Sequence, residues 1–127
     1  MSQITTHVLD TAAGRPAADL GVALYRRVRG ESDESGESGE GGESSWEELA
    51  RGTTNADGRV ADLLDPDIVL DAGCYRVRFN TGPYLEQAVG DAFYPWADVV
   101  FNINAGGEHY HIPLLLSPFG YSTYRGS

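Results

Sequence analysis

The stretch that decides the fold is HYHIPLLLSPFGYSTYRGS, residues 109–127. Its first eight residues alternate in a strand-like way, so that Tyr110, Ile112 and Leu114 share one face. His109 and His111 then lie together on the opposite face. The stretch therefore predicts two successive strands, over 109–116 and 120–125, the first of which presents two histidines on one side.

Short segments of the same kind recur along the whole chain. Further strands are expected over residues 4–10, 22–28, 46–54, 74–80 and 97–103. Gly14 and Pro16 mark a loop, residues 55–58 (NADG) a tight turn and residues 63–73 a connecting loop. Residues 83–93 (PYLEQAVGDAF) are the one helix candidate. The pattern predicts an all-β sandwich of seven to eight strands with one short helix, in a single domain over residues 1–127.

The formal charge of −10 is concentrated in one segment. Residues 31–48 hold eight of the nineteen acidic residues and no arginine, which leaves eleven acidic residues against nine arginines elsewhere. The Gly-, Ser- and Glu-rich part at about 30–45 has little apolar surface to bury, and we expect a disordered loop inserted between two strands. A solvated charge run is favoured there over capture of a metal or a partner. Without a basic face, nucleic acid is a disfavoured partner.

The opening residues and the single cysteine bear on location. MSQITTHVLD has no basic segment followed by an apolar run, so no signal peptide is expected. The apolar runs are far shorter than the ~18 residues that span a bilayer, and the expectation is a cytoplasmic protein that does not associate with a membrane. Cys74 alone forms no intrachain disulfide and is expected to be a passive strand residue.

The three histidines form a candidate constellation. In residues 4–10 the apolar Ile4 and Val8 face the core, which places His7 on the other side, as His109 and His111 are placed. A zinc site is one interpretation, with Glu108 as a further ligand. A metal-free acid/base pair with an arginine is the second. Three unrelated surface histidines are the third, and local sequence does not separate the three interpretations.

Three segments carry a resemblance to a known family. These are residues 4–26 (ITTHVLDTAAGRPAADLGVALYR), residues 55–60 (NADGRV) and the closing residues 109–127. Together they resemble the transthyretin-like 5-hydroxyisourate hydrolases, and the terminal YRGS is the feature that separates these enzymes from the carrier transthyretin. The resemblance covers almost the whole chain except the acidic insert, which is much longer than is usual in the family. It implies a transthyretin-like two-sheet sandwich and a homotetramer, a dimer of dimers with its sites at the dimer–dimer interface.

The resemblance also implies a function and a set of site residues. The expected reaction is hydrolysis of 5-hydroxyisourate, an oxidised purine of urate breakdown, at its N1–C6 amide to 2-oxo-4-hydroxy-4-carboxy-5-ureidoimidazoline. The implied catalytic residues are His7, Arg59, His111 and Ser127. The implied substrate contacts are His7, Arg59, Tyr124, Arg125 and Gly126, with His109 in second rank. The family uses no metal or cofactor, which favours histidine acid/base chemistry with arginine stabilisation over zinc.

Other function classes remain beside the hydrolase. A carrier of a small ligand on the same fold is the first, as transthyretin shows. A zinc-dependent hydrolase is the second, and a purely structural sandwich comes last. His7, Arg59, His111 and the terminal YRGS favour the enzyme, because a carrier's channel is lined by more apolar groups.

Overall fold

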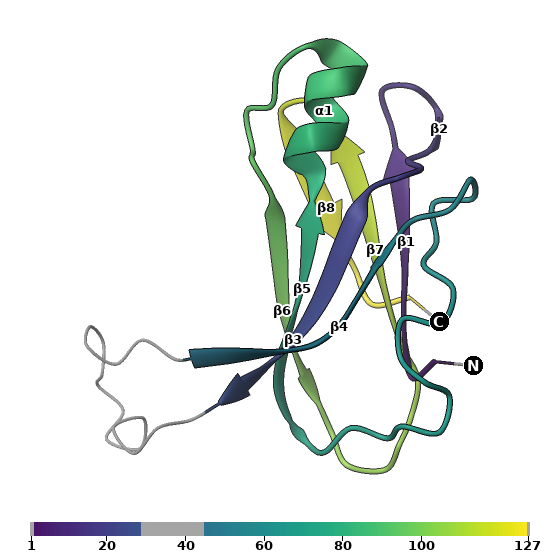
Figure 1. Ribbon diagram of the computed structural model, residues 1–127, viewed down its shortest axis with the longest axis vertical. Helices are drawn as coiled ribbons and strands as arrows, with labels where there is room; N and C mark the ends of the chain where they lie inside the picture. The colour runs from purple at the N-terminus through teal and green to yellow at the C-terminus, as the bar shows by residue number, and fades with distance from the viewer. Residues whose placement is uncertain (1, 29–44, 127) are drawn as a thin grey trace.

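The fold is a sandwich of two four-stranded sheets. It is seen in a computed structural model that describes residues 2–28 and 45–126. One sheet has the strand order β2-β1-β7-β8 and the other β4-β3-β5-β6. Figure 1 shows the two sheets side by side, with the one helix of the described chain at an end of the sandwich. The all-β, two-sheet prediction is confirmed.

The elements follow the chain in a simple order. The strands are β1 (Ile4–Asp10), β2 (Arg15–Pro16), β3 (Gly21–Val28), β4 (Ser45–Thr53), β5 (Gly73–Asn80), β6 (Ala97–Ile103), β7 (Tyr110–Ser117) and β8 (Gly120–Thr123). Helix α1 (Thr81–Val89) lies between β5 and β6. All strand pairs are antiparallel except β1 and β7, which run parallel.

The parallel pair of β1 and β7 positions the candidate site. Its register sets Thr5 opposite His111 and His7 opposite Pro113. Buried and half-buried residues alternate strictly along β1, with Ile4 and Val8 fully buried. His7 and His111 are half-buried, on the outward face of the sheet. The predicted facing of both strands is confirmed.

The core lies between the two sheets. Its fully buried large side chains include Val8, Leu24, Tyr75, Val77, Phe79 and Leu114. Each contributes roughly 1.5–3 kcal/mol through burial of apolar surface. The loop from β4 to β5 also reaches the core, because Val60, Leu63 and Leu64 are buried. This packing holds the loop against β1 (Figure 1), although it has no regular secondary structure.

Helix α1 differs from the predicted residues 83–93 at both ends. It ends at Val89 because Gly90 adopts a left-handed conformation, φ 88°, and donates its N–H to the Glu86 carbonyl. It begins earlier because the Gly82 N–H donates to the Pro95 carbonyl at 2.9 Å, and a side chain at Gly82 would collide with that oxygen. The start is thus determined by a tertiary contact that local sequence does not reveal.

Smaller differences concern loops and strand ends. The predicted loop around Gly14 and Pro16 contains the two-residue strand β2, which pairs with the end of β1. The last strand ends at Thr123, before the predicted residue 125. The expected disordered loop at about 30–45 lies outside the described residues up to residue 44, and Ser45 is the first residue of β4. Within the described ranges, no helix has the length and apolar character to cross a membrane.

Candidate active site

The NADG turn places Arg59 beside β1. The side chain of Asn55 accepts hydrogen bonds from the N–H groups of Asp57 and Arg59, at 2.9 and 3.1 Å. Gly58 has φ 77°, and a Cβ there would overlap the Val8 carbonyl oxygen. Glycine is therefore required both by its backbone angle and by the close approach of the turn to β1. The Gly58 carbonyl accepts the Val8 N–H at 2.8 Å, which anchors the turn.

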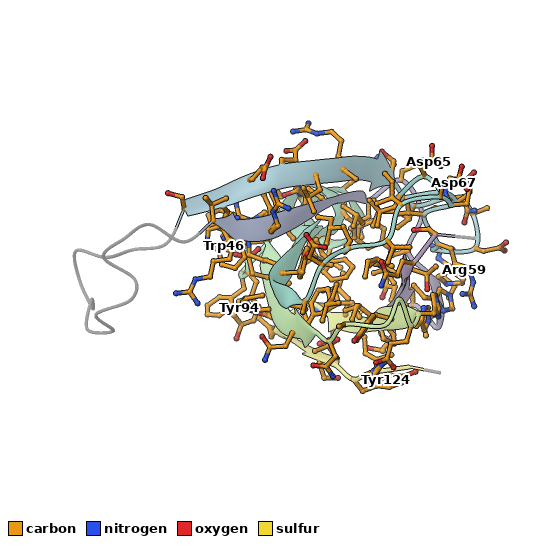
Figure 2. The ribbon with its side chains drawn as sticks, turned by 90° about the horizontal axis from the view of Figure 1, so that it is seen from below. Trp46, Arg59, Asp65, Asp67, Tyr94 and Tyr124 are labelled. Carbon is orange, nitrogen blue, oxygen red and sulfur yellow. The ribbon has the colours of Figure 1, made fainter. Side chains whose placement is uncertain are left out.

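This anchoring brings Arg59 and the histidines together. Arg59 forms an isolated antiparallel bridge with His7. A cavity of about 480 Å³ is lined by Arg59, His109, His111, Thr5, Asn55 and Asp62, among others. His7 lies beside this cavity and is not among its lining residues. Figure 2 shows Arg59 at one flank of the sandwich, on the side of the loop between β4 and β5.

His109, the residue before β7, and His111 in β7 are connected through a hydroxyl of β1. Thr5 Oγ1 lies 2.8 Å from His111 Nδ1 and 2.9 Å from His109 Nε2. The two imidazole rings stack with a 6.4 Å separation of their centroids. Because Thr5 occupies Nδ1 of His111, Nε2 is the nitrogen of this ring that remains for a ligand in the cavity.

Two of the histidines have a lowered pKa. Partial burial and the nearby Arg59 guanidinium lower the pKa of His111, and the other two histidines add to the effect. Partial burial and Arg59 likewise lower the pKa of His7, while Asp57 acts in the opposite direction. Both imidazoles are thus held more firmly neutral than ordinary histidines at neutral pH, which is the form that accepts a proton.

The segment after β8 packs on His111 through Gly126. The Gly126 N–H donates to the His111 carbonyl at 2.9 Å, and the two residues form an isolated bridge. A Cβ on Gly126 would lie 2.5 Å from Cδ2 of the His111 ring. The absence of a side chain at Gly126 therefore lets the terminal backbone approach the imidazole.

Tyr124 and Arg125 lie apart from Arg59 within one chain. Both line a second cavity, of about 230 Å³, together with residues of β6 and β7. The Arg125 guanidinium stacks 4.3 Å from the centre of the Tyr110 ring and pairs with Glu108 at 3.3 Å. Figure 2 shows Tyr124 on a different flank from Arg59.

The structure thus groups part of the predicted site. It brings His7, Arg59, His109, His111 and Gly126 together. Tyr124 and Arg125 do not line this cavity, although the Arg125 guanidinium donates to the His109 carbonyl at 3.4 Å. Ser127 lies outside the described residues. The roles of all these residues stay predictions. Among residues 2–28 and 45–126, no three His, Cys, Asp or Glu side chains are grouped so as to hold a metal ion.

Sequence reasoning did not identify Thr5, Asn55 and Asp62 as site residues. The strand alternation that places His7 outward also places Thr5 outward, so this signal was present in the sequence. Asn55 begins the turn that was recognised. Asp62 adopts φ 57°, an unusual backbone for aspartate, and no local pattern indicates its position at the cavity.

Comparisons with known proteins show which family the chain belongs to. The family model described as the HIUase/Transthyretin family matches residues 4–126. The chain is 41% identical over 126 residues to the 5-hydroxyisourate hydrolase of Mus musculus, covering 99% of this chain and 96% of that protein. It is 43% identical over 129 aligned residues to the 5-hydroxyisourate hydrolase of Halalkalibacterium halodurans, covering 98% of each.

Solved structures agree in fold. The 5-hydroxyisourate hydrolase of Klebsiella pneumoniae superposes with a TM-score of 0.75 at 36% identity over the full length of both chains. Transthyretin from Sparus aurata superposes with a TM-score of 0.81 at 29% identity, covering 99% of this chain and 97% of that one. The backbone therefore resembles hydrolase and transthyretin alike, while sequence identity is higher to the hydrolases. The chain belongs to the HIUase/transthyretin family.

Proposed function

We propose that this chain is a 5-hydroxyisourate hydrolase, which opens its substrate at the N1–C6 amide to give 2-oxo-4-hydroxy-4-carboxy-5-ureidoimidazoline. One observation carries the proposal: Arg59, His109 and His111 line one cavity of about 480 Å³, and His7 forms a backbone bridge with Arg59. Burial, together with Arg59, lowers the pKa of His7 and His111. The high identity to hydrolases of animals and bacteria over nearly the whole chain supports it. A cavity of this size and polarity suits a small, oxygen-rich heterocycle.

Histidine is the proposed general acid and base. Water is a weak nucleophile, so its attack on C6 needs a base that is neutral at working pH. His111 is proposed as this base, because it lines the cavity and its Nε2 is not the nitrogen that contacts Thr5. His7, which lies beside Arg59, orients the substrate or the water. The hydroxide adds to C6, the C6–N1 bond breaks, and N1 receives the proton that the base removed.

Arg59 stabilises the charge that develops in this step. Attack on the amide carbonyl produces an oxyanion, and a fixed guanidinium beside the histidines can pair with it. The backbone N–H and carbonyl of Arg59 are both held by Asn55, at 3.1 and 2.8 Å, so the side chain starts from a fixed position. Such prepositioned charge is typically worth ~10²–10³ in rate.

The assembly and its location belong to the same proposal. We expect a homotetramer in the cytoplasm, with the cavity completed at the interface between dimers. The placement of Tyr124 and Arg125 away from Arg59 supports a shared site, since within one subunit these two residues do not line the cavity. Specific activity should then fall on dilution together with the tetramer. Full activity in proven monomers would rule out the shared site.

The decisive experiment follows the decay of fresh substrate. 5-Hydroxyisourate is generated from urate with a urate oxidase, and its ultraviolet decay is recorded with and without the folded protein, with and without a chelator, at low and high salt. Acceleration that survives the chelator is expected. Acceleration that the chelator abolishes would establish the zinc-dependent alternative. No acceleration at either salt would favour the carrier alternative.

Substitutions then assign the roles. His111→Asn should lower kcat by about 100-fold or more, as expected for loss of a general base. His7→Asn is expected to act more on KM. The opposite ranking would make His7 the base.

A further inference from the structure

Thr5 occupies an unusual place at the cavity. Its hydroxyl oxygen is within hydrogen-bond distance of two imidazoles at once, His111 Nδ1 at 2.8 Å and His109 Nε2 at 2.9 Å. The parallel register of β1 and β7 sets Thr5 directly opposite His111. The planes of the two imidazoles lie 18° from parallel. The site residues predicted from the sequence do not include Thr5.

The chemistry of a hydroxyl restricts how these contacts can form. Thr5 has one hydrogen to donate and two lone pairs to accept with. When both rings are neutral and Thr5 donates its hydrogen to one of them, the other ring nitrogen has to donate to Thr5 for both contacts to be hydrogen bonds. Two arrangements satisfy this condition. In the first, both rings carry their hydrogen on Nδ1; in the second, both carry it on Nε2.

We propose that Thr5 is a positioning residue that couples the tautomers of His109 and His111 and relays a proton between them. In the first arrangement His111 Nδ1–H donates to Thr5 Oγ1, which donates to His109 Nε2, so that His111 Nε2 is free to act as a base. In the second, His111 Nε2 bears the hydrogen and can act as an acid. The inference rests on the proposed hydrolase function, since it assigns the path of the proton that the base removes.

The relay is balanced at each step. His111 Nε2 takes the proton from the attacking water, its Nδ1 proton passes to Thr5 Oγ1, and the hydroxyl proton passes to His109 Nε2. His111 is then neutral with hydrogen on Nε2, and His109 carries the positive charge. Return of the proton along the same path lets His111 protonate the leaving N1. His109, an exposed residue, is a better place for a transient charge than half-buried His111 beside Arg59.

The other charged groups around His111 do not supply an alternative relay. His7 and Arg59 face it from β1 and from the loop after β4, and both disfavour a charge on its ring. Asp62 lines the same cavity but forms no hydrogen bond or ion pair with either imidazole among the described residues. Thr5 is the residue that the described structure shows bonded to both rings.

Four proteins test the relay: wild type, Thr5→Val, Thr5→Ser and Thr11→Val. Thr5→Val keeps the shape and removes the hydroxyl, and Thr5→Ser keeps the hydroxyl. Thr11→Val is the matched control, because it makes the same change beyond the far end of β1, where the hydroxyl bonds the Leu116 carbonyl at 3.1 Å. Thr5→Val should lower kcat at least tenfold with KM within about twofold, and change the pH profile of kcat. Thr5→Ser should restore most of the rate, and Thr11→Val should match wild type.

A second measurement reads the tautomers without any substrate. Long-range ¹H–¹⁵N spectra of the imidazoles at about pH 8, where ordinary histidine is neutral, identify the hydrogen-bearing nitrogen of each ring. His109 and His111 should show the same tautomer in wild type and lose this correspondence in Thr5→Val. Opposite tautomers in wild type would overturn the relay even if Thr5→Val does not fold. Equal loss of rate in Thr5→Val and Thr5→Ser would also overturn it.

The two proposals fail in different ways. Wild-type protein that does not accelerate substrate decay would refute the hydrolase function, whatever the spectra show. If the wild type is active and Thr5→Val has the same rate and the same pH profile, the relay is refuted and the hydrolase function stands.

Discussion

Gly126→Ala tests whether the terminal backbone must touch the His111 ring. The added Cβ would lie 2.5 Å from Cδ2 and 3.2 Å from Cγ of His111, whereas ordinary contacts begin at 3.4 Å. The imidazole or the terminal backbone therefore has to move by about 0.9 Å. Gly126 is not among the glycines with positive φ, so alanine introduces this contact without backbone strain.

The expected consequence is a large loss of activity with little loss of stability. A misplacement of ~1 Å at a catalytic group costs on the order of 100-fold in rate, equivalent to ~2.7 kcal/mol of transition-state stabilisation. The Gly126 N–H can still bond to the His111 carbonyl, and Gly126 makes no contribution to the core. The free energy of unfolding should therefore change by less than about 1 kcal/mol.

The assay compares kcat/KM on fresh 5-hydroxyisourate with the midpoint of thermal unfolding. Gly120→Ala is the matched control in the same closing segment, because its Cβ would lie 3.7 Å from Ser117 Oγ, an ordinary contact. Gly120→Ala should keep wild-type activity. If Gly126→Ala were within threefold of wild type, the terminal segment would be free to yield, and the argument that it sets the His111 ring would be wrong.

Three further predictions follow from individual contacts. Gly58→Ala should destabilise the protein by more than 2 kcal/mol in urea denaturation, because it adds a collision with β1 to the strain of positive φ; Gly14→Ala has similar φ but open space and should cost only ~1 kcal/mol. Thr6→Val should raise the free energy of unfolding by ~1 kcal/mol, because the fully buried Thr6 hydroxyl has no hydrogen-bond partner among the described residues; a decrease would reveal a partner. Arg59→Gln should raise the pKa of His7 and His111, because Arg59 helps to lower both, and the acid limb of the pH–rate profile should therefore move to higher pH. The prediction is contradicted if the acid limb of the residual activity does not move, or if NMR titration shows unchanged pKa values for the two rings.

The lowered pKa values of His7 and His111 also make the stability of the protein depend on pH. Because the folded-state pKa of His7 and His111 lies below the unfolded value of 6.5, the unfolded chain binds more protons as the pH falls below 6.5. Their neutral, half-buried state therefore contributes stability above this pH, which is lost as the pH falls through the folded pKa values. In Arg59→Gln, where the pKa shifts are smaller, the free energy of unfolding should decrease less as the pH falls below 6.5.

Some features of this protein are local and are determined by the sequence alone. Strand alternation has a period of two, so the outward facing of His7 and His111 follows from which neighbours are apolar. His109, just before β7, is exposed. The NADG turn likewise follows from residue types, since Asn55 bonds the turn backbone and Gly58 takes positive φ. The resemblance of the closing residues to one family identified the fold class correctly.

Other features are decided only when distant segments pack. Thr5 and His111 are 106 residues apart, and they meet because the inward faces of β1 and β7 both have to be buried, which sets the register. Helix α1 begins where Gly82 meets Pro95. The Arg125 guanidinium contacts Glu108, the Tyr110 ring and the His109 carbonyl, and it does not line the histidine cavity. Sequence specifies which way each side chain faces along a strand, whereas burial of the shared core determines which of them lie opposite one another.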